Sequence, residues 1–195
     1  KLLKAAARFA DYAAAHFGPE EGKCKGYPGH EIAEMALVRL YEVTKEPRYL
    51  ELSKFFIDER GKQPYYFDKE HPEEVKKDHE NDLRYFYNQA HLPVRQQDEA
   101  VGHAVRAVYL YSGMADIARL TEDETLYQSC EKLWDSMANE KMYTNSSTLK
   151  WDLEPRLVPN TMASGFLRAS SSSSSMVLYL ESAFTQMYAQ LSRFT

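Results

Sequence analysis

The feature that most constrains the fold of this chain is a helical hairpin that occurs twice. Residues Ala36–Asp58 read ALVRLYEVTKEPRYLELSKFFID, and residues Gly113–Asp135 read GMADIARLTEDETLYQSCEKLWD. Both segments read as the end of one helix, a turn at a threonine, a charged linker and a second helix that opens with a Leu/Tyr pair. Repeated hairpins of this kind indicate either an α-solenoid or a closed α/α barrel.

Apolar side chains recur at helical spacing along most of the chain, and no segment alternates cleanly enough to be a strand, so the expected class is all-α. The segment 61–81, which is polar and contains two prolines, is expected to be a long loop. The ranges expected to be helical are Leu2–Phe17, Glu31–Thr44, Pro47–Arg60, Glu99–Ala118 (with a possible bend at Gly113), Asp123–Asn139 and Met176–Phe194.

A Gly-His pair precedes each hairpin, with the histidines at His30 and His103. The inner helices of an α/α barrel begin at one common mouth, so the repeated pairs would place two imidazoles there. Gly29 would allow a tight turn or the close approach of a ligand. Both histidines are therefore candidate substrate-binding residues, although each could instead be a capping or loop residue at a hairpin junction.

A polar stretch, QAHLPVRQQDEA, leads into the second Gly-His pair. Pro93 favours an extended backbone here, and an extended polar segment before an inner helix could line a cleft. This makes His91 and Gln97 further candidates for substrate binding. A loop histidine bonded to backbone is an equally good interpretation of His91. Asp98 and Glu99 are accounted for by favourable charge near a helix start, which explains Gln97 less well.

Composition excludes several classes of protein. The net charge is −5 and the pI is about 5.7, which argues against a nucleic-acid-binding face. No apolar run is long enough to span a bilayer. Cys24 and Cys130 are too few for a secreted disulfide framework and have no metal-ligand spacing, so they are interpreted as ordinary thiols. A cytoplasmic location is the default expectation.

Three longer segments carry a family resemblance: GYPGHEIAEMALVRLYEVTKEPRYLELSKFFIDERG, YNQAHLPVRQQDEAVGHAVRAVYLYSGMADIA and CEKLWDSMANEKMY. In this order they closely resemble proteins of glycoside hydrolase family 127, the β-L-arabinofuranosidases and their relatives, over about residues 26–143. The resemblance implies an (α/α)6-barrel catalytic domain, of which residues 1–195 are expected to form an incomplete portion. It also implies exo-acting hydrolysis of terminal β-L-arabinofuranosyl groups with retention.

The same resemblance implies that His30 and His103 hold the sugar. It further implies a cysteine nucleophile, a glutamate acid/base and a zinc ion that keeps the cysteine as a thiolate. Zinc is expected for the complete family protein, but no ligand is identifiable in this chain. Glu154 is the carboxylate nearest to the acid/base position. A run of serines stands where a zinc-ligand motif is expected, so residues 144–195 are expected to be incomplete or misassigned sequence.

Two other functions stay open. The altered C-terminal segment would suit a non-catalytic carbohydrate-binding protein or a degenerate barrel. Another α/α-barrel activity, such as that of a uronyl hydrolase or an epimerase, would need carboxylates or histidines at the mouth but no cysteine. The expected partner is a small carbohydrate, an L-arabinofuranoside, with no nucleic acid and no membrane, and a homodimer is possible.

Overall fold

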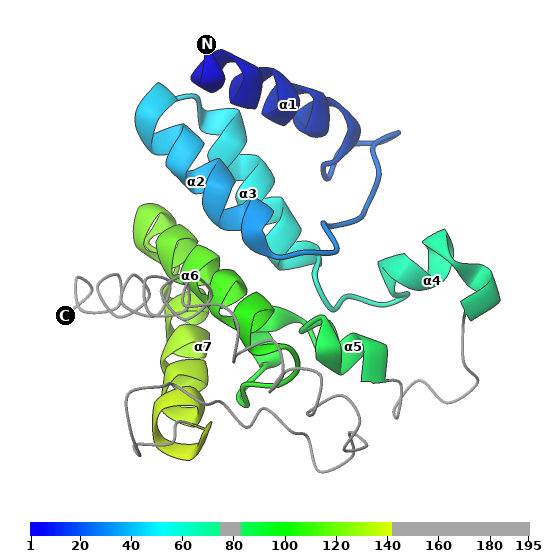
Figure 1. Cartoon of the computed structure of the whole chain (residues 1–195), viewed down its shortest axis with the longest axis vertical. Coiled ribbons are helices and arrows are strands. Elements are labelled where there is room, and N and C mark those ends of the chain that lie inside the picture. Colours follow the sequence, from blue (N-terminus) through cyan, green and yellow to red (C-terminus); the bar gives the residue numbers. More distant parts are fainter. Residues whose placement is uncertain (75–82, 142–195) are drawn as a thin grey trace, which may run out of the picture.

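The structure is a computed structural model that describes residues 1–74 and 83–141, and within them the chain is helical with no strand (Figure 1). This confirms the all-α class; the helix expected at Met176–Phe194 lies outside the described residues. Shorter helical turns lie at Pro72–Glu74, Val94–Gln96 and Ser136–Lys141. The α-helices are α1 (Leu2–His16), α2 (Ile32–Thr44), α3 (Pro47–Glu59), α4 (Tyr66–Glu70), α5 (Leu83–Tyr87), α6 (Ala104–Thr121) and α7 (Glu124–Asp135).

The two hairpins, α2–α3 and α6–α7, share one turn geometry. Thr44 and Thr121 each donate their hydroxyl to the carbonyl four residues earlier, at 2.7 Å in both turns. Lys45 and Glu122 follow, and both adopt the left-handed conformation that ends many helices, with φ of 59° and 53°. The repeat read from the sequence is therefore a repeat in three dimensions.

Helices α2 and α6 pack side by side and in parallel (Figure 1). An ion pair of 2.7 Å joins Arg39 to Asp116, and one of 3.1 Å joins Glu42 to Arg119. Each pair links positions 77 residues apart, which are equivalent positions of the two hairpins. Equivalent positions can face each other in this order only if the two helices run in the same direction. This is the arrangement of neighbouring inner helices in an α/α barrel.

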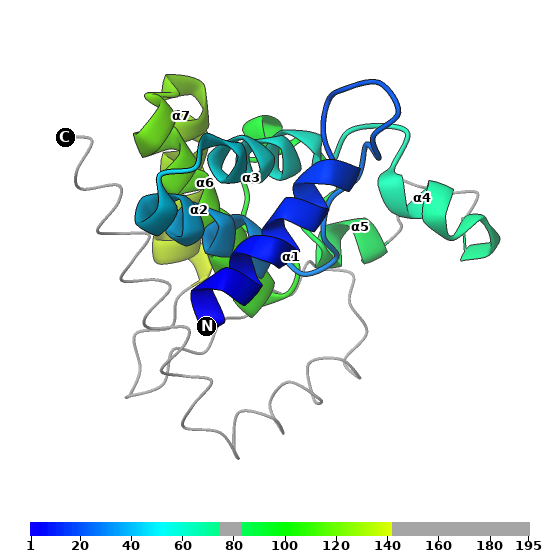
Figure 2. The same ribbon diagram turned by 90° about the horizontal axis from the view of Figure 1, so that it is seen from above.

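Helix α6 forms the centre of the core, and every residue from Leu110 to Ala118 is buried, so this part of the helix is covered all round. Gly113 lies within this helix and packs against α2, where an added Cβ would be 3.2 Å from the Cβ of Glu34. The helix is continuous through Gly113, so this glycine serves close helix packing and does not interrupt the helix. On the other side of α2 and α3 lies α1, as Figure 2 shows.

Two expected helix boundaries and one expected loop were wrong. Helix α6 begins at Ala104 and not at Glu99, because Gly102 takes a φ of 80° that no helix contains. Helix α7 ends at Asp135 and continues as a wider π-type turn. The segment expected to be a loop contains α4 and a short helical turn. Phe67 of α4 packs its ring on Tyr27, with the centroids 5.2 Å apart, which attaches this segment to the core.

Candidate functional site

The two Gly-His pairs lie at the starts of adjacent parallel helices. His30 stands just before Glu31, the N-cap residue of α2, and His103 is itself the N-cap residue of α6. The ring of His30 lies 6.0 Å from that of Tyr109 on α6, and the ring of His103 meets that of Tyr87 edge-on at 5.4 Å. The fold therefore brings together two histidines that are 73 residues apart in the chain.

The glycines of the two Gly-His pairs differ in backbone conformation and in the space around them. Gly102 has a positive φ, and a Cβ there would collide with the carbonyl oxygen of Phe86. Gly29 has no such constraint, and a Cβ there would meet only the ring of Phe67, at 4.0 Å. The backbone thus requires a glycine before His103 but not before His30, where the missing side chain leaves open space.

The surroundings of both imidazoles favour the neutral form. His30 is exposed, and the partial desolvation of its ring together with the positive charge of Arg106 lowers its pKa. Burial also lowers the pKa of His103, followed in effect by the charges of Arg106 and His30. A neutral imidazole has one donor and one acceptor nitrogen, so near neutral pH each ring can exchange hydrogen bonds with a hydroxyl group.

Arg106, which the sequence reading did not single out, connects the two histidine-bearing segments. Its Nη1 donates to the carbonyl oxygen of Gly29 at 2.8 Å and to Oδ1 of Asn88. Its guanidinium lies over the ring of Tyr87, 5.0 Å from the centroid. The available signal was a charged residue three positions after His103, in the first turn of a largely apolar helix.

A buried charge cluster lies next to the first pair. The side chain of Arg60 is fully buried and pairs with Glu31 at 3.2 Å and with Glu34 at 3.1 Å. It also donates to the carbonyl oxygens of Pro28 and Asn88, at 2.8 and 3.0 Å. Burial raises the pKa of Glu31 to about 7 in spite of the arginine. Arg60 thus holds the start of α2 and the residues before His30 in one place.

His91 and Gln97 lie in a cluster formed by their own segment. The ring of His91 stacks on Phe86 with centroids 4.6 Å apart, and burial lowers its pKa to about 4. The amide nitrogen of Gln97 donates to the carbonyls of Gln89 and Leu92, at 2.8 and 2.7 Å. Gln97 is 1% exposed, so these bonds chiefly fold its own loop. A sugar contact by either residue stays a prediction.

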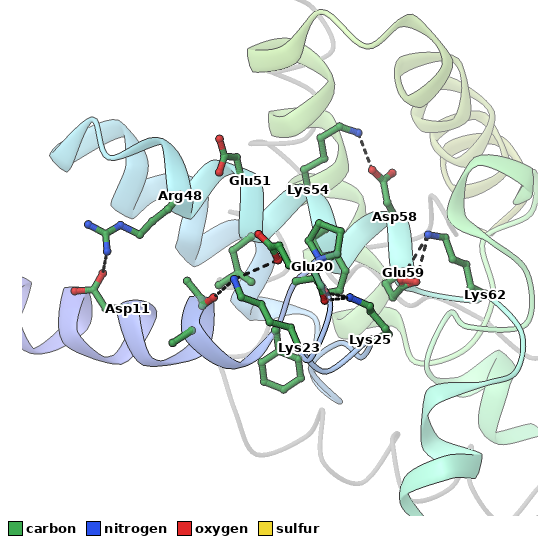
Figure 3. Close-up of a pocket in the computed structure, with 17 residues that line it drawn as sticks. Asp11, Glu20, Lys23, Lys25, Arg48, Glu51, Lys54, Asp58, Glu59 and Lys62 are labelled. Carbon is green, nitrogen blue, oxygen red and sulfur yellow. Dashed lines mark hydrogen bonds and ion pairs between the residues drawn. The ribbon is translucent and has the colours of Figure 1, made fainter.

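A groove of about 870 Å³ lies between α1, α3 and the connection after α1, and none of the expected site residues lines it (Figure 3). Most of its charged side chains bond to neighbours, as Lys23 does to Glu20 at 3.2 Å and Lys54 to Asp58 at 2.7 Å. Because these charges are already compensated, the groove offers less chemistry than the histidine pair does.

Comparisons with known proteins agree with this architecture. The family described as β-L-arabinofuranosidase, GH127 catalytic domain, matches residues 1–148. The chain belongs to glycoside hydrolase family 127. It is 40% identical over 150 residues to a non-reducing end β-L-arabinofuranosidase of Bifidobacterium longum subsp. longum, a match that covers 75% of this chain and 23% of that protein.

Solved structures of family 127 show the same fold. A β-L-arabinofuranosidase from Geobacillus stearothermophilus T6 aligns with a TM-score of 0.65 and 48% identity, covering 70% of this chain and 22% of that one. A second family 127 β-arabinofuranosidase aligns with a TM-score of 0.59 and 44% identity, covering 72% and 19%. The chain therefore spans about a quarter or less of the length of these relatives.

The described residues do not fit the zinc site that the family resemblance implies. Residues 1–74 and 83–141 contain no group of three or more His, Cys, Asp or Glu side chains that could hold a metal ion. Cys130 is fully buried, and burial raises the pKa of its thiol, so it is not a thiolate. Cys24 is exposed and unpaired with Cys130. The carboxylate expected as acid/base, Glu154, lies outside the described residues.

Proposed function

We propose that this chain is the sugar-binding part of a glycoside hydrolase that removes β-L-arabinofuranosyl groups from non-reducing ends. The observation that carries the proposal is the pair His30 and His103 at the starts of two adjacent parallel helices, in a chain of family 127. The named activity of the Bifidobacterium relative supports the choice of sugar.

The chemistry of the pair suits a neutral sugar. A nitrogen of a neutral imidazole donates to a hydroxyl or accepts from one, according to the tautomer, and two such rings together fix the orientation of a small sugar ring. The open space beside Gly29 leaves room for a ligand close to His30. His91 and Gln97 are proposed to support the same sugar site from the preceding segment. Retention, the acid/base role of Glu154 and a zinc ion enter this proposal through the family resemblance alone.

Binding is the direct test. Calorimetric titration of the chain with methyl β-L-arabinofuranoside is expected to show binding, with the α anomer as the control ligand. His30→Ala and His103→Ala are each expected to weaken binding about tenfold, the equivalent of one lost hydrogen bond of about 1.4 kcal/mol. Arg48→Gln, which removes an exposed ion pair between Arg48 of α3 and Asp11 of α1, is the matched control and should bind like the parent chain. Equal affinity of the parent chain and both histidine variants would rule out the proposed site.

A second function is carbohydrate binding without hydrolysis. Two observations favour it: the buried thiol of Cys130 is protonated, and the described ranges contain no group of side chains that could hold a metal ion. Release of nitrophenol from p-nitrophenyl β-L-arabinofuranoside, measured with and without added zinc, separates the two functions. Binding with turnover supports the hydrolase. Binding without turnover in either condition supports the second function for this chain.

No helix in residues 1–74 or 83–141 has the length and apolar character needed to cross a membrane. A cytoplasmic location belongs to the proposal as a default. A homodimer also belongs to it, supported by the apolar side chains that α1 exposes, of which Leu2 and Phe9 are 84% and 76% exposed. Sedimentation equilibrium tests the oligomeric state.

A further inference from the structure

Two arginines hold the backbone just before His30. Arg60 donates to the carbonyl of Pro28 at 2.8 Å, and Arg106 donates to the carbonyl of the next residue, Gly29, also at 2.8 Å. The same two arginines also meet at Asn88, where Arg60 binds the main-chain oxygen and Arg106 binds the side-chain oxygen. The residues that carry His30 are thereby tied to the segment around Asn88 at two successive carbonyls.

Arg106 differs from Arg60 in its place in the fold. Arg60 is fully buried, whereas Arg106 is only partly buried and lies one turn into α6 after His103. The guanidinium covers the ring of Tyr87, and the ring of His103 meets that same tyrosine edge-on. The main-chain nitrogen of His103 also donates to the carbonyl of Tyr87, at 3.3 Å. One side chain therefore contacts the immediate supports of both histidines.

We propose that Arg106 is a positioning residue that holds the His30 loop against the start of α6 and so sets the spacing of the two imidazoles that receive the sugar. The inference rests on the proposed function of the histidine pair. A planar guanidinium suits this role because it donates to several acceptors and stacks on an aromatic face at the same time, which an ammonium group does not do.

The charge of Arg106 also affects the protonation of the two histidines. After burial, the positive charge of Arg106 is the next largest cause of the lowered pKa of both His30 and His103. A cation close to an imidazole disfavours protonation of the ring. Arg106 thus adds to burial in favouring the neutral form of both rings, which can accept a hydrogen bond from a hydroxyl group.

The test is a histidine titration by NMR on the full chain, in which single histidine substitutions assign the signals of the six histidines. Arg106→Gln keeps a hydrogen-bond donor but removes the charge, and we expect the titration midpoints of His30 and His103 to shift upward together. The midpoint of His91, whose pKa burial lowers and on which Glu99 and Asp98 act but Arg106 does not, is the internal control and should stay in place. Arg48→Gln, which removes the charge of an arginine away from the two histidines, is the matched control. It should leave the midpoints of His30 and His103 unchanged.

Arg106→Lys separates charge from geometry. The lysine keeps the cation but not the forked donor, so we expect the midpoints to return toward those of the parent chain. Affinity for methyl β-L-arabinofuranoside is expected to fall about tenfold in Arg106→Gln and to recover only in part in Arg106→Lys. Thermal unfolding checks that both variants are folded.

Unchanged midpoints and unchanged affinity in a folded Arg106→Gln chain would overturn the role of Arg106. Shifted midpoints in a chain whose parent binds no arabinofuranoside would instead support the role of Arg106 while contradicting the proposed function. The two failures are therefore distinguishable.

Discussion

At the scale of single residues, the two Gly-His pairs differ in whether the backbone requires a glycine. Gly102 is needed because its backbone is left-handed and the carbonyl of Phe86 occupies the place of a side chain. Gly29 has neither constraint. The glycine before His103 therefore serves the fold, and the glycine before His30 is available for a functional reason. This difference was not visible in the sequence, where both pairs read alike.

Alanine substitution at the two glycines should separate these roles. We expect Gly102→Ala to lower the free energy of unfolding by at least about 2 kcal/mol, from backbone strain together with the collision at Phe86. Gly29→Ala should change it by less than about 0.5 kcal/mol but weaken arabinofuranoside binding. Urea unfolding and calorimetric titration measure the two quantities. Equal destabilisation by both substitutions would contradict this assignment.

At the scale of elements, the two hairpins each contain a turn that strains its backbone. Lys45 and Glu122 hold left-handed conformations that glycine usually occupies at helix ends. The hydroxyls of Thr44 and Thr121 bond back to the preceding turn, so both helix ends are closed in the same way. Since the turns are equivalent, substitutions in them should have equivalent effects.

Glycine at either strained position is expected to stabilise the chain. Relief of about 1–2 kcal/mol of left-handed strain outweighs the extra chain entropy of glycine, about 0.5–1 kcal/mol. Lys45→Gly and Glu122→Gly should each raise the free energy of unfolding by about 1 kcal/mol or less, and the effects should add. Glu46→Gly is the matched control, because Glu46 has a φ of −83° and gains no relief. Destabilisation by Lys45→Gly that equals that of Glu46→Gly would count against shared strain.

At the scale of the whole molecule, buried ionisable groups link stability to pH in opposite directions. Burial raises the pKa of Glu31 to about 7 and that of Asp116 to about 6. Burial lowers the pKa of His91 to about 4. A carboxyl with a raised pKa stabilises the fold less as pH rises, and a histidine with a lowered pKa stabilises it less as pH falls. The total dependence therefore partly cancels, and single variants are needed to resolve it.

Glu31→Gln should reveal one of these contributions. The folded-state pKa of about 7 lies above the ordinary value of 4.5, so the folded chain binds this proton more tightly than the unfolded chain. Stability due to Glu31 is present below about pH 4.5 and is lost as pH rises to about 7. Relative to the parent chain, the variant should thus gain stability across this window, by up to about 3 kcal/mol.

Urea unfolding at intervals between pH 4.5 and 8 measures the difference between the two chains. The ionic groups that act on Glu31 are Arg60, Arg106 and Glu34, and none of them is altered in the variant. A difference that stays constant with pH would show that Glu31 does not titrate in this range.

Much of the fold could be predicted because it depends on local spacing. The ends of α1, α2 and α3 lie within one residue of their expected positions, since helical periodicity and Pro47 act over a few residues. The expected start of α6 was five residues too early. Gly102 has a left-handed backbone and lies against the carbonyl of Phe86, so the helix begins only after it. The charges of Asp98 and Glu99 favoured a helix start at Glu99, but the packing of the neighbouring segment places the start at Ala104.

The sequence by itself determined the class, the paired hairpins and the histidines that stand before them, because each depends on side chains only a few residues apart. Only the tertiary structure decided that His30 and His103 share supports. That outcome depends on contacts between Arg106 and Gly29, and between Arg60 and Asn88, which lie 77 and 28 residues apart. Hydrogen bonds across such separations have no periodic signature in a chain and form only when its helices have packed.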